Sequence, residues 1–599
     1  MHVVATAGHV DHGKSTLVRA LTGMEPDRLD EERRRGLTIE LGYAWTALPS
    51  GERLAFVDVP GHERFLATML AGVGPVPAVM FVVAADEGWM PQSEEHLVAL
   101  EALGVRHCLL VVTRSDLADP APVVAQALAR LDTAGLGEVE AVAVSGRTGQ
   151  GLPELRQALD RLVSGLPRPD PAAAVRLWID RAFSVTGSGT VITGTLPAGT
   201  VSVGDELLLA GEPVRVRGLE SLKEPRGTVT GVARVAVNLR GHDVPGRGHA
   251  LVTPGGWTST DLVDVRLSHV GAHVGGLRRE AAGLPRRLTV HIGSAAVAAE
   301  ARPLAGRVVR LRLARPVPLH LGDVLLLRDP GRDRSEMRVL AGASVLDVRP
   351  PALGRRGAAR QRAAFLESAL LDEALPEAFA PGTAYALRLH RLLRAADLRA
   401  MGVAPDAPGM SGEWHADPGH WKDLGRRLVA AVRHYAAGHP LDPAMPIEAA
   451  RHELGLPDRR LVAPLVRPPL ALAGGRIVAG PAGLPERVAR AVERMRRDLA
   501  ARPFHAPDAG RLAELGLGPR ELAAAERAGS LLRVGEGVAL LPGADARAAE
   551  LLSRLPQPFT VSQARQALDT TRRVVVPLLE HLDRAGLTER VDEVHRRCR

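Results

Sequence analysis

Apolar runs alternate with amphipathic segments along the first 170 residues. Buried-strand patterns occur at "HVVATA", "LAFVDV", "HCLLVVT" and "EAVAV", and segments with helical spacing such as "STLVRALTG" lie between them. Strands that alternate with helices over this length predict a doubly wound parallel sheet, which binds ligands at the carboxyl ends of its strands. We therefore expect an α/β domain of the P-loop type over residues 1–170.

The hydrophobic period shortens after a proline-rich stretch at 164–174. Alternating runs such as "VRLWIDRAFSV" and "ARVAVNLRG" follow, with turns about every 8 to 12 residues. This pattern is typical of small β-barrels. It predicts one barrel over residues 175–258 and a second over residues 259–350.

The remaining residues repeat weakly at about 55 to 65 residues, which indicates a tandem array. The clearer copies contain a turn, a short helix, a second turn, a longer helix and a strand. We expect four α+β units of the winged-helix type, at residues 360–425, 426–482, 483–543 and 544–599.

The last of these units reads as a helix-turn-helix with a wing. "SQARQAL" predicts its first helix, "TTRRVVVPLLEHLDRAG" the second, and "LTERV" the start of a hairpin. Apolar spacing in the second helix leaves Arg572 and Arg573 at its exposed start, where they oppose the helix dipole unless an anion lies nearby. Both are candidate RNA-binding residues.

Composition narrows the class of protein. The 599 residues carry a net charge of +8, which makes a polyanionic partner plausible. Two cysteines give no disulfide framework, and neither a secretion signal nor a clean membrane span is evident. We expect a cytoplasmic monomer that does not enter a membrane. Only three of the 76 basic residues are lysines, so a retained lysine is informative.

The loop "GHVDHGKST" has the spacing of a phosphate-binding loop. Backbone N–H groups between Gly8 and Gly13 can surround phosphates, Lys14 can reach the β and γ phosphates, and the Ser15 hydroxyl can bind Mg²⁺. The neighbouring residues expected at the nucleotide are Asp11, His12 and Thr16. His9 and His12 also form an H-x-x-H pattern, but zinc usually needs three or four ligands, and we interpret both as loop structure.

Two later segments complete the expected Mg²⁺ and γ-phosphate site. Thr38 follows a charged loop and can bind Mg²⁺ only while the γ phosphate orders that loop. Asp58 ends a buried strand, where it can reach the Mg²⁺ shell, and Gly61 can donate its N–H to the γ phosphate.

The stretch "VVTRSD" occupies the place where GTP-binding proteins carry Asn-Lys-x-Asp. Asp116 is expected to accept from the guanine edge, while Arg114 replaces the lysine and has the methylenes to cover the base. Thr113 replaces the asparagine, which we expect to weaken the bracing of the loop. The turn with Ser145, Gly146 and Arg147 is expected to give a backbone N–H to guanine.

These motifs resemble the translation-factor GTPases, whose first loop reads G-H-V-D-H-G-K and whose third motif reads D-x-P-G-H. The resemblance implies GTP and GDP as ligands with Mg²⁺. It also implies that His62 positions the attacking water, with Val10 and Leu37 as an apolar gate that the ribosome opens. Hydrolysis should then be slow without the activator.

The barrels and the last unit are similar to those of the bacterial selenocysteine-specific elongation factors. That resemblance assigns Asp180 and Arg181, in "IDRAF", to an aminoacyl pocket. Adjacent strand residues face opposite sides, so both reach one ligand only near a bend or edge, and an exposed ion pair is the alternative.

By this resemblance the chain is a GTP-dependent carrier. It would bring selenocysteinyl-tRNA to ribosomes at recoded UGA codons, and its winged helices would bind a hairpin in selenoprotein mRNA. One alternative is a GTP-dependent regulator whose winged helices bind DNA or protein. Another is a general elongation or initiation factor with an unrelated tail.

Overall fold

The computed structural model describes residues 1–26, 32, 38–74, 76–185, 189–240, 246–268, 280–331, 339–371, 381–479 and 484–599. Two compact units divide the chain, Met1–Gly409 and Met410–Arg599. Within the described ranges, no helix is long and apolar enough to cross a membrane.

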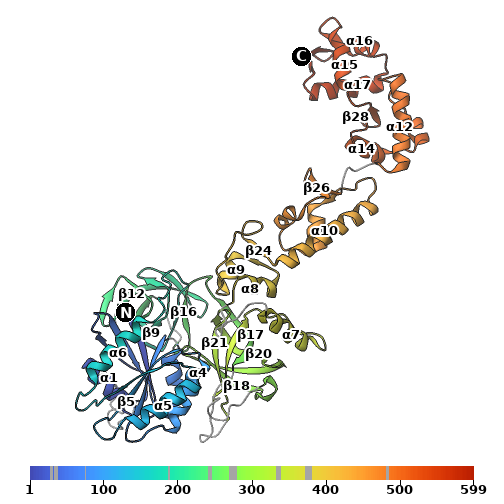
Figure 1. The fold of residues 1–599 in the computed structure, drawn as a ribbon. Helices are drawn as coiled ribbons and strands as arrows, with labels where there is room; N and C mark the ends of the chain where they lie inside the picture. Colours follow the sequence, from blue (N-terminus) through green and yellow to red (C-terminus); the bar gives the residue numbers. More distant parts are fainter. Residues whose placement is uncertain are drawn as a thin grey trace. The chain divides into compact units, whose positions relative to one another are not determined.

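A six-stranded sheet with helices on both faces forms the start of the first unit (Figure 1). Its strand order is β2-β3-β1-β4-β5-β6, and β2 alone runs antiparallel to its neighbour. The strands are β1 (His2–Ala7), β2 (Gly42–Ala47), β3 (Arg53–Asp58), β4 (Ala78–Ala84), β5 (His107–Thr113) and β6 (Glu140–Ala143). The predicted doubly wound sheet is confirmed.

Alternating side chains along the sheet build two cores. Val4 faces a core closed by α1 (Lys14–Thr22) and α6 (Leu152–Ser164). Val3 and Ala5 face the other core, which α3 (Leu66–Val73), α4 (Pro91–Ala102) and α5 (Ala121–Thr133) cover. Burial on both faces explains the continuous apolar runs in the sequence.

The next domain curls its strands into a barrel-like sheet in the order β7-β16-β11-β12-β15-β9-β8. The chain bends after β7, where Ile179 N donates to His249 O and Asp180 N donates to Thr193 O, so this segment bridges two strands. The main strands are β7 (Arg176–Trp178), β8 (Arg181–Val185), β9 (Gly189–Leu196), β11 (Glu206–Leu209), β12 (Glu212–Ser221), β15 (Ala233–Arg240) and β16 (Ala250–Val252). Short strands are β10 (Thr200–Ser202), β13 (Glu224–Arg226) and β14 (Thr228–Thr230).

Six strands close a second barrel in the order β17-β20-β19-β18-β21-β22. They are β17 (Thr258–Ser268), β18 (Arg287–Ile292), β19 (Ala295–Ala305), β20 (Val308–Leu319), β21 (Val324–Arg328) and β22 (Val339–Asp347). In the described part of the first unit it is followed by α7 (Ala358–Leu371), α8 (Thr383–His390) and α9 (Ala395–Ala400).

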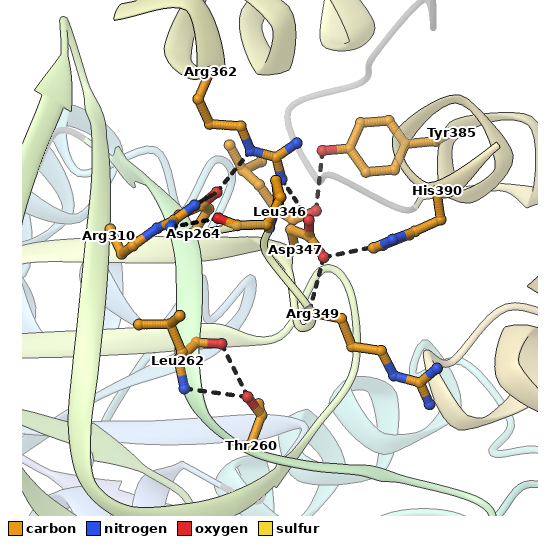
Figure 2. Close-up of polar contacts among 11 residues, drawn as sticks. Thr260, Leu262, Asp264, Arg310, Leu346, Asp347, Arg349, Arg362, Tyr385 and His390 are labelled. Carbon is orange, nitrogen blue, oxygen red and sulfur yellow. Dashed lines mark hydrogen bonds and ion pairs between the residues drawn. The ribbon is translucent and has the colours of Figure 1, made fainter. Parts of the chain in front are cut away.

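A buried network of charges joins this barrel to α7 and α8 (Figure 2). Asp264 accepts hydrogen bonds from Arg310 at 2.7 and 3.0 Å and from Arg362 at 2.9 Å. Asp347 accepts from Arg362 and lies 3.1 Å from the His390 Nε2 atom. Each buried carboxylate is therefore paired, and loss of one partner would leave an uncompensated charge.

His390 contributes to the charge state of this network. Burial opposes ionisation of Asp347, but the hydrogen bond and charge of His390, with Arg362, lower the pKa of this carboxyl below its ordinary value. A lowered pKa stabilises the fold above the unfolded value of about 3.9, and that stability is lost as pH falls through the folded pKa.

In a His390→Leu variant, the junction of α8 and β22 should open more often than in the parent protein. As the pH is lowered, this opening should also begin at a higher pH than in the parent protein. We expect a loss of about 1–2 kcal/mol, because one hydrogen bond to a charged group is removed while Arg362 remains. Hydrogen exchange of the β22 and α8 amides measures this local opening. His390→Gln, which keeps a donor, should exchange almost as slowly as the parent protein. Unchanged exchange in the leucine variant would contradict this role for His390.

The second unit contains three successive groups of helices with a small sheet. The first has α10 (Pro418–Gly438), α11 (Ile447–Leu454) and the sheet β25-β27-β26 at Met445–Pro446, Arg476–Ala479 and Leu470–Ala473. The second has α12 (Glu486–Ala501), α13 (Ala509–Leu515), α14 (Pro519–Arg527), β28 (Leu532–Gly535) and β29 (Val538–Leu540). The strand β24 (Trp414–Ala416) precedes them, and β23 (Leu392–Arg394) belongs to the first unit.

Helix α10 corrects one predicted boundary. It runs without interruption from Pro418 to Gly438, through the expected division between residues 425 and 426. Asp417 accepts from His420 N at 2.8 Å and caps the helix, and proline at the first helical position suits a helix start. The glycines and proline near residue 420 thus belong to a helix rather than to a linker.

The last group confirms the predicted helix-turn-helix and wing. It comprises α15 (Ala544–Ser553), β30 (Phe559–Thr560), α16 (Val561–Ala567), α17 (Arg572–Arg584), β31 (Thr588–Arg590) and β32 (His595–Cys598). The expected apolar face of α17 is fully buried, at Val575, Leu578, Leu579 and Leu582. Its core is continuous with that of the preceding group, so residues 484–599 pack as one body.

Candidate functional site

A cleft of about 230 Å³ opens at the carboxyl edge of the six-stranded sheet. The sequence-predicted residues that line it are Asp11, Gly13, Thr16, Thr113, Arg114, Asp116, Gly146 and Arg147. Leu17 and Leu117 complete the lining. Asp116 is exposed to the cleft, while Ser145 is buried and its hydroxyl accepts from Thr148 N at 3.1 Å. The three segments thus meet at one edge, as the motif order predicts.

Thr113 braces the phosphate loop. Its hydroxyl donates to His12 O at 2.7 Å from a fully buried position. The hydroxyl therefore supplies a short buried hydrogen bond between the base site and the phosphate loop. Threonine therefore braces the loop through this bond, and the expected loss of bracing relative to asparagine stays a prediction.

Arg114 also joins the base site to the phosphate loop. Its guanidinium donates to the carbonyl of Asp11 and to the carboxylates of Asp86, at 2.9 Å, and Glu87, at 2.6 Å. Sequence reasoning missed the two carboxylates, which follow β4. The planar donor set of arginine serves several acceptors at once, so Arg114 can do more here than a lysine.

Two side chains of α4 hold the phosphate loop from beneath. Gln92 Oε1 accepts from Val10 N at 3.1 Å, and His96 Nδ1 accepts from Gly8 N at 3.0 Å. Burial lowers the pKa of His96 to about 3, so its ring is neutral and Nδ1 can accept.

The other predicted phosphate-loop side chains contact the protein itself. Lys14 Nζ donates to the carbonyl of His9 at 2.6 Å. His12 is buried and points to Glu87 rather than into the cleft.

A His96→Ala variant should release bound nucleotide about tenfold faster. The substitution leaves the buried N–H of Gly8 without an acceptor, which costs about 1–3 kcal/mol, and part of this is regained when the loop relaxes. Stopped-flow displacement of a fluorescent GDP measures the rate. His107→Ala, a change at the start of β5, is the matched control. Equal release rates in all three proteins would exclude a positioning role for His96.

Three oxygens converge where Mg²⁺ is expected. Ser15 Oγ lies 2.9 Å from Thr38 Oγ1 and donates to Asp58 Oδ2 at 2.6 Å. Burial raises the pKa of Asp58, against the opposing hydrogen bond from Ser15 and the charge of Lys14. A nearby divalent cation would offset the cost of this buried carboxylate. Hydroxyl and carboxylate oxygens also suit Mg²⁺, so these residues fit the predicted ion.

Gly61 lies directly against the phosphate loop. A Cβ atom at this position would be 2.5 Å from both Lys14 Nζ and Val10 N, so no larger residue fits. The following residue, His62, is partly exposed, and its Nδ1 accepts from Arg64 N at 3.2 Å. Val10 lies beside this glycine, whereas Leu37, the other predicted gate residue, is outside the described residues.

A second cleft, of about 220 Å³, lies between the α/β domain and the first barrel. Asp180 sits at the bend between β7 and β8, not on a continuous strand as predicted, and its side chain is 4% exposed. It accepts from Arg234 at 2.5 Å and from Thr193 at 2.7 Å. The exposed-pair alternative is therefore wrong, because Asp180 is buried and its partner is Arg234.

Arg181 and Arg234 both line this cleft. The guanidinium of Arg234 lies 3.9 Å from the centre of the Tyr43 ring, and Arg181 lies 6.0 Å from it. Arg181 also pairs with Glu40 at 2.9 Å. Sequence reasoning missed Tyr43 and Arg234. An arginine within the alternating strand "ARVAVNLRG" was the available signal, but many arginines in this chain share that setting.

The two arginines at the start of α17 have different surroundings. Arg572 is exposed. The guanidinium of Arg573 donates to the carbonyls of Ala506 at 2.6 Å and Pro507 at 2.9 Å. Both side chains are exposed, but Arg573 also connects the last two winged-helix groups, so we take Arg572 as the first candidate for RNA.

Three family profiles match parts of the chain. The elongation factor Tu GTP binding domain matches residues 1–165, the β-barrel domain of selenocysteine-specific elongation factor matches 281–352, and the winged helix of elongation factor SelB matches 550–597. They fall on the α/β domain, the second barrel and the last winged helix.

Curated relatives give the same assignment. The selenocysteine-specific elongation factor of Escherichia coli (strain K12) is 38% identical over 363 residues, which are 59% of this chain and 56% of that protein. Elongation factor Tu 2 of Streptomyces avermitilis is 30% identical over 366 residues, which are 55% of this chain and 93% of that protein. The chain spans about half the length of the selenocysteine-specific relatives it matches.

Among solved structures, one match also includes the winged-helix part of the chain. A crystal structure of bacterial selenocysteine-specific elongation factor EF-Sec matches 100% of both chains, with a TM-score of 0.73 and 25% identity. SelB from Methanococcus maripaludis in complex with the GTP analogue GPPNHP matches 58% of this chain and 79% of that chain, with a TM-score of 0.51 and 22% identity. The second likeness shows the fold alone.

Proposed function

Since the chain belongs to the elongation factor Tu family of translation GTPases, in its selenocysteine-specific (SelB) branch, we propose that it delivers selenocysteinyl-tRNA to the ribosome at recoded UGA codons. The protein would act as a monomer in the cytoplasm. GTP would hold it in the tRNA-binding state, and hydrolysis to GDP would release the tRNA.

The nucleotide cleft supports a GTP-switched mechanism. Asp116 would accept from the guanine edge, and Lys14 would exchange its loop carbonyls for phosphate oxygens. Ser15 and Thr38 would hold Mg²⁺, with Asp58 behind Ser15, and this ion would neutralise charge on the phosphates. His62 would turn from its own loop to orient the attacking water, which needs positioning more than a strong base.

The observation that carries the selenocysteine assignment is the set of guanidinium groups that line the second cleft. Its lining includes Arg181, Lys223 and Arg234 together with Glu220, and Arg234 and Arg181 are also paired with Asp180 and Glu40. A selenol ionises below neutral pH, whereas a seryl hydroxyl does not. Guanidinium groups in a partly buried cleft therefore favour the selenolate side chain over serine on the same tRNA. Asp180 would fix the direction of Arg234.

The last winged helix would bind the mRNA hairpin through Arg572. A second attachment to the message raises the local concentration of the carrier at the recoded codon without new tRNA contacts. RNA recognition of this kind combines backbone contacts from cations with readout of unpaired bases in a loop. Arg573 would serve indirectly, because it holds the last two groups together.

The deciding experiment compares the affinity of the GTP-loaded protein for selenocysteinyl-tRNA and for seryl-tRNA on the same tRNA body. A clear preference for the selenocysteinyl form is expected, and equal affinities would remove the specific assignment.

Binding to the mRNA hairpin needs a separate test. Removal of residues 545–599 should abolish it, but would also expose the core that these residues share with the preceding group. Arg572→Ala is the cleaner variant, and Arg547→Ala on the exposed face of α15 is its control.

Arg572→Ala should weaken binding to the mRNA hairpin and lower its salt dependence by about one phosphate contact, while GTP binding stays unchanged. The control should retain both activities. Equal hairpin affinity in the two variants would assign RNA binding to another surface.

A further inference from the structure

Helix α10 has an outer face that the proposed function does not use. The exposed side chains on this face include Lys422, Arg426, Arg427 and Arg433, with Asp423 as the acidic neighbour. Lys422, Arg426 and Arg433 recur at helical spacing and form one stripe. Arg426 pairs with Asp423 at 2.8 Å, an exposed contact that contributes little. Within the described part of the chain, Lys422 and Arg433 form no ion pair.

A groove of about 420 Å³ lies between α10, α11 and β25, on the side of α10 next to this stripe; Arg427 lines it, whereas Lys422, Arg426 and Arg433 lie outside its lining. Tyr435 and His439 lie on its α10 side with their rings stacked, 4.1 Å between centres and 14° between planes. Arg427 and His434 also line the groove, and Glu453 lies across it on α11. The groove therefore combines a flat aromatic surface with cations at its edge.

We propose that α10 binds single-stranded RNA, with an unpaired base stacked in the groove against Tyr435 and His439 and the phosphates along the stripe of Lys422, Arg426 and Arg433. Stacking on aromatic rings beside a positively charged track is how proteins hold single strands. The groove volume lies within the range of roughly 300–1,000 Å³ typical of small-ligand sites. This surface goes beyond the proposed function, because it lies two groups before the last winged helix.

The composition of the groove favours RNA over a peptide. A helical peptide would need a row of apolar anchors. The large apolar side chains in the lining are Met445 and Leu454, and both are buried. Accessible cations at the rim instead match phosphate groups, and an aromatic surface accepts any base.

The first test uses the full chain with Arg572→Ala present throughout, which reduces the contribution of the last winged helix. Binding of a fluorescent 12-nucleotide oligouridylate is measured by anisotropy at several salt concentrations. The variant Lys422→Ala, Arg426→Ala, Arg433→Ala should bind at least tenfold more weakly, and its salt slope should fall by about 2, since single strands contribute about 0.7 per phosphate.

A matched control removes the same charge from another helix of the same unit. Arg494, Arg496 and Arg497 are exposed on α12, and their joint replacement by alanine should change the affinity less than twofold. An equal loss in the two triple variants would show a general charge effect and overturn the proposal. Unchanged oligouridylate binding in the α10 variant would also overturn it and leave this face to a protein partner.

The second test isolates stacking. Tyr435→Leu should bind the oligonucleotide at least fivefold more weakly, whereas Tyr435→Phe, which keeps the ring, should bind as the parent protein does. A 5-iodouridine probe should cross-link to a peptide that contains Tyr435. A structured hairpin of the same length should compete poorly, because its bases are paired. Equal binding of the leucine and phenylalanine variants would exclude a base in the groove.

Discussion

An Asp116→Asn variant should lose most of its affinity for GTP and GDP and should gain affinity for xanthosine triphosphate. The carboxylate can accept two hydrogen bonds from guanine, and hydrogen bonds to charged groups contribute about 1.5–3 kcal/mol each. Their loss corresponds to a fall of about 10² to 10⁴ in affinity. Xanthine carries a carbonyl where guanine carries its amino group, so the new amide N–H gains an acceptor. Titration with fluorescent nucleotides measures both affinities.

The structure makes this a clean substitution. Asp116 is exposed in the cleft, so its replacement disturbs no buried contact of the fold. The loop geometry is held by Thr113 and Arg114 instead. Asp119→Asn is the matched control, because this nearby carboxylate accepts from Ala121 N at the start of α5. GTP affinity that survives unchanged in Asp116→Asn would remove Asp116 from the base site.

Short motifs predicted which residues would meet at the candidate nucleotide site, because each motif is local and the sheet topology brings them together. Ser15, Thr38 and Asp58 come from three separate segments. In the fold, however, the Ser15 hydroxyl lies within hydrogen-bonding distance of both the Thr38 hydroxyl and the Asp58 carboxylate. Strand ends in a parallel sheet share one edge, so residues that follow each strand must meet there. The same rule explains why Thr113 reaches His12.

Contacts between domains could not be predicted in this way. Arg234 meets Tyr43 across the junction of the α/β domain and the first barrel, and neither residue belongs to a motif. In the buried network, Asp264 and Arg362 are 98 residues apart and likewise belong to no motif. With 76 basic residues in the chain, an arginine that pairs with a buried carboxylate looks like any other. Which arginine pairs with which buried carboxylate is determined by the folded backbone.

The arrangement around Arg234 has a direct consequence for tRNA selection. Its guanidinium holds Asp180 at 2.5 and 3.3 Å, contacts Thr195 at 3.1 Å and covers the Tyr43 ring. Replacement of Arg234 by methionine removes a cation from the cleft. It also leaves the carboxylate of Asp180 almost fully buried without its partner. Both changes disfavour an anionic ligand side chain.

We therefore expect Arg234→Met to lower the preference of the GTP-loaded protein for selenocysteinyl-tRNA over seryl-tRNA by about 2–5 kcal/mol, roughly thirtyfold to several thousandfold. Arg215→Met, an exposed change on β12 of the same barrel, should keep the preference. Asp180→Asn combined with Arg234→Met should recover part of the lost affinity, because the unpaired carboxylate no longer repels the selenolate. An unchanged preference in Arg234→Met would place the aminoacyl side chain outside this cleft, even if GTP binding and the fold were intact.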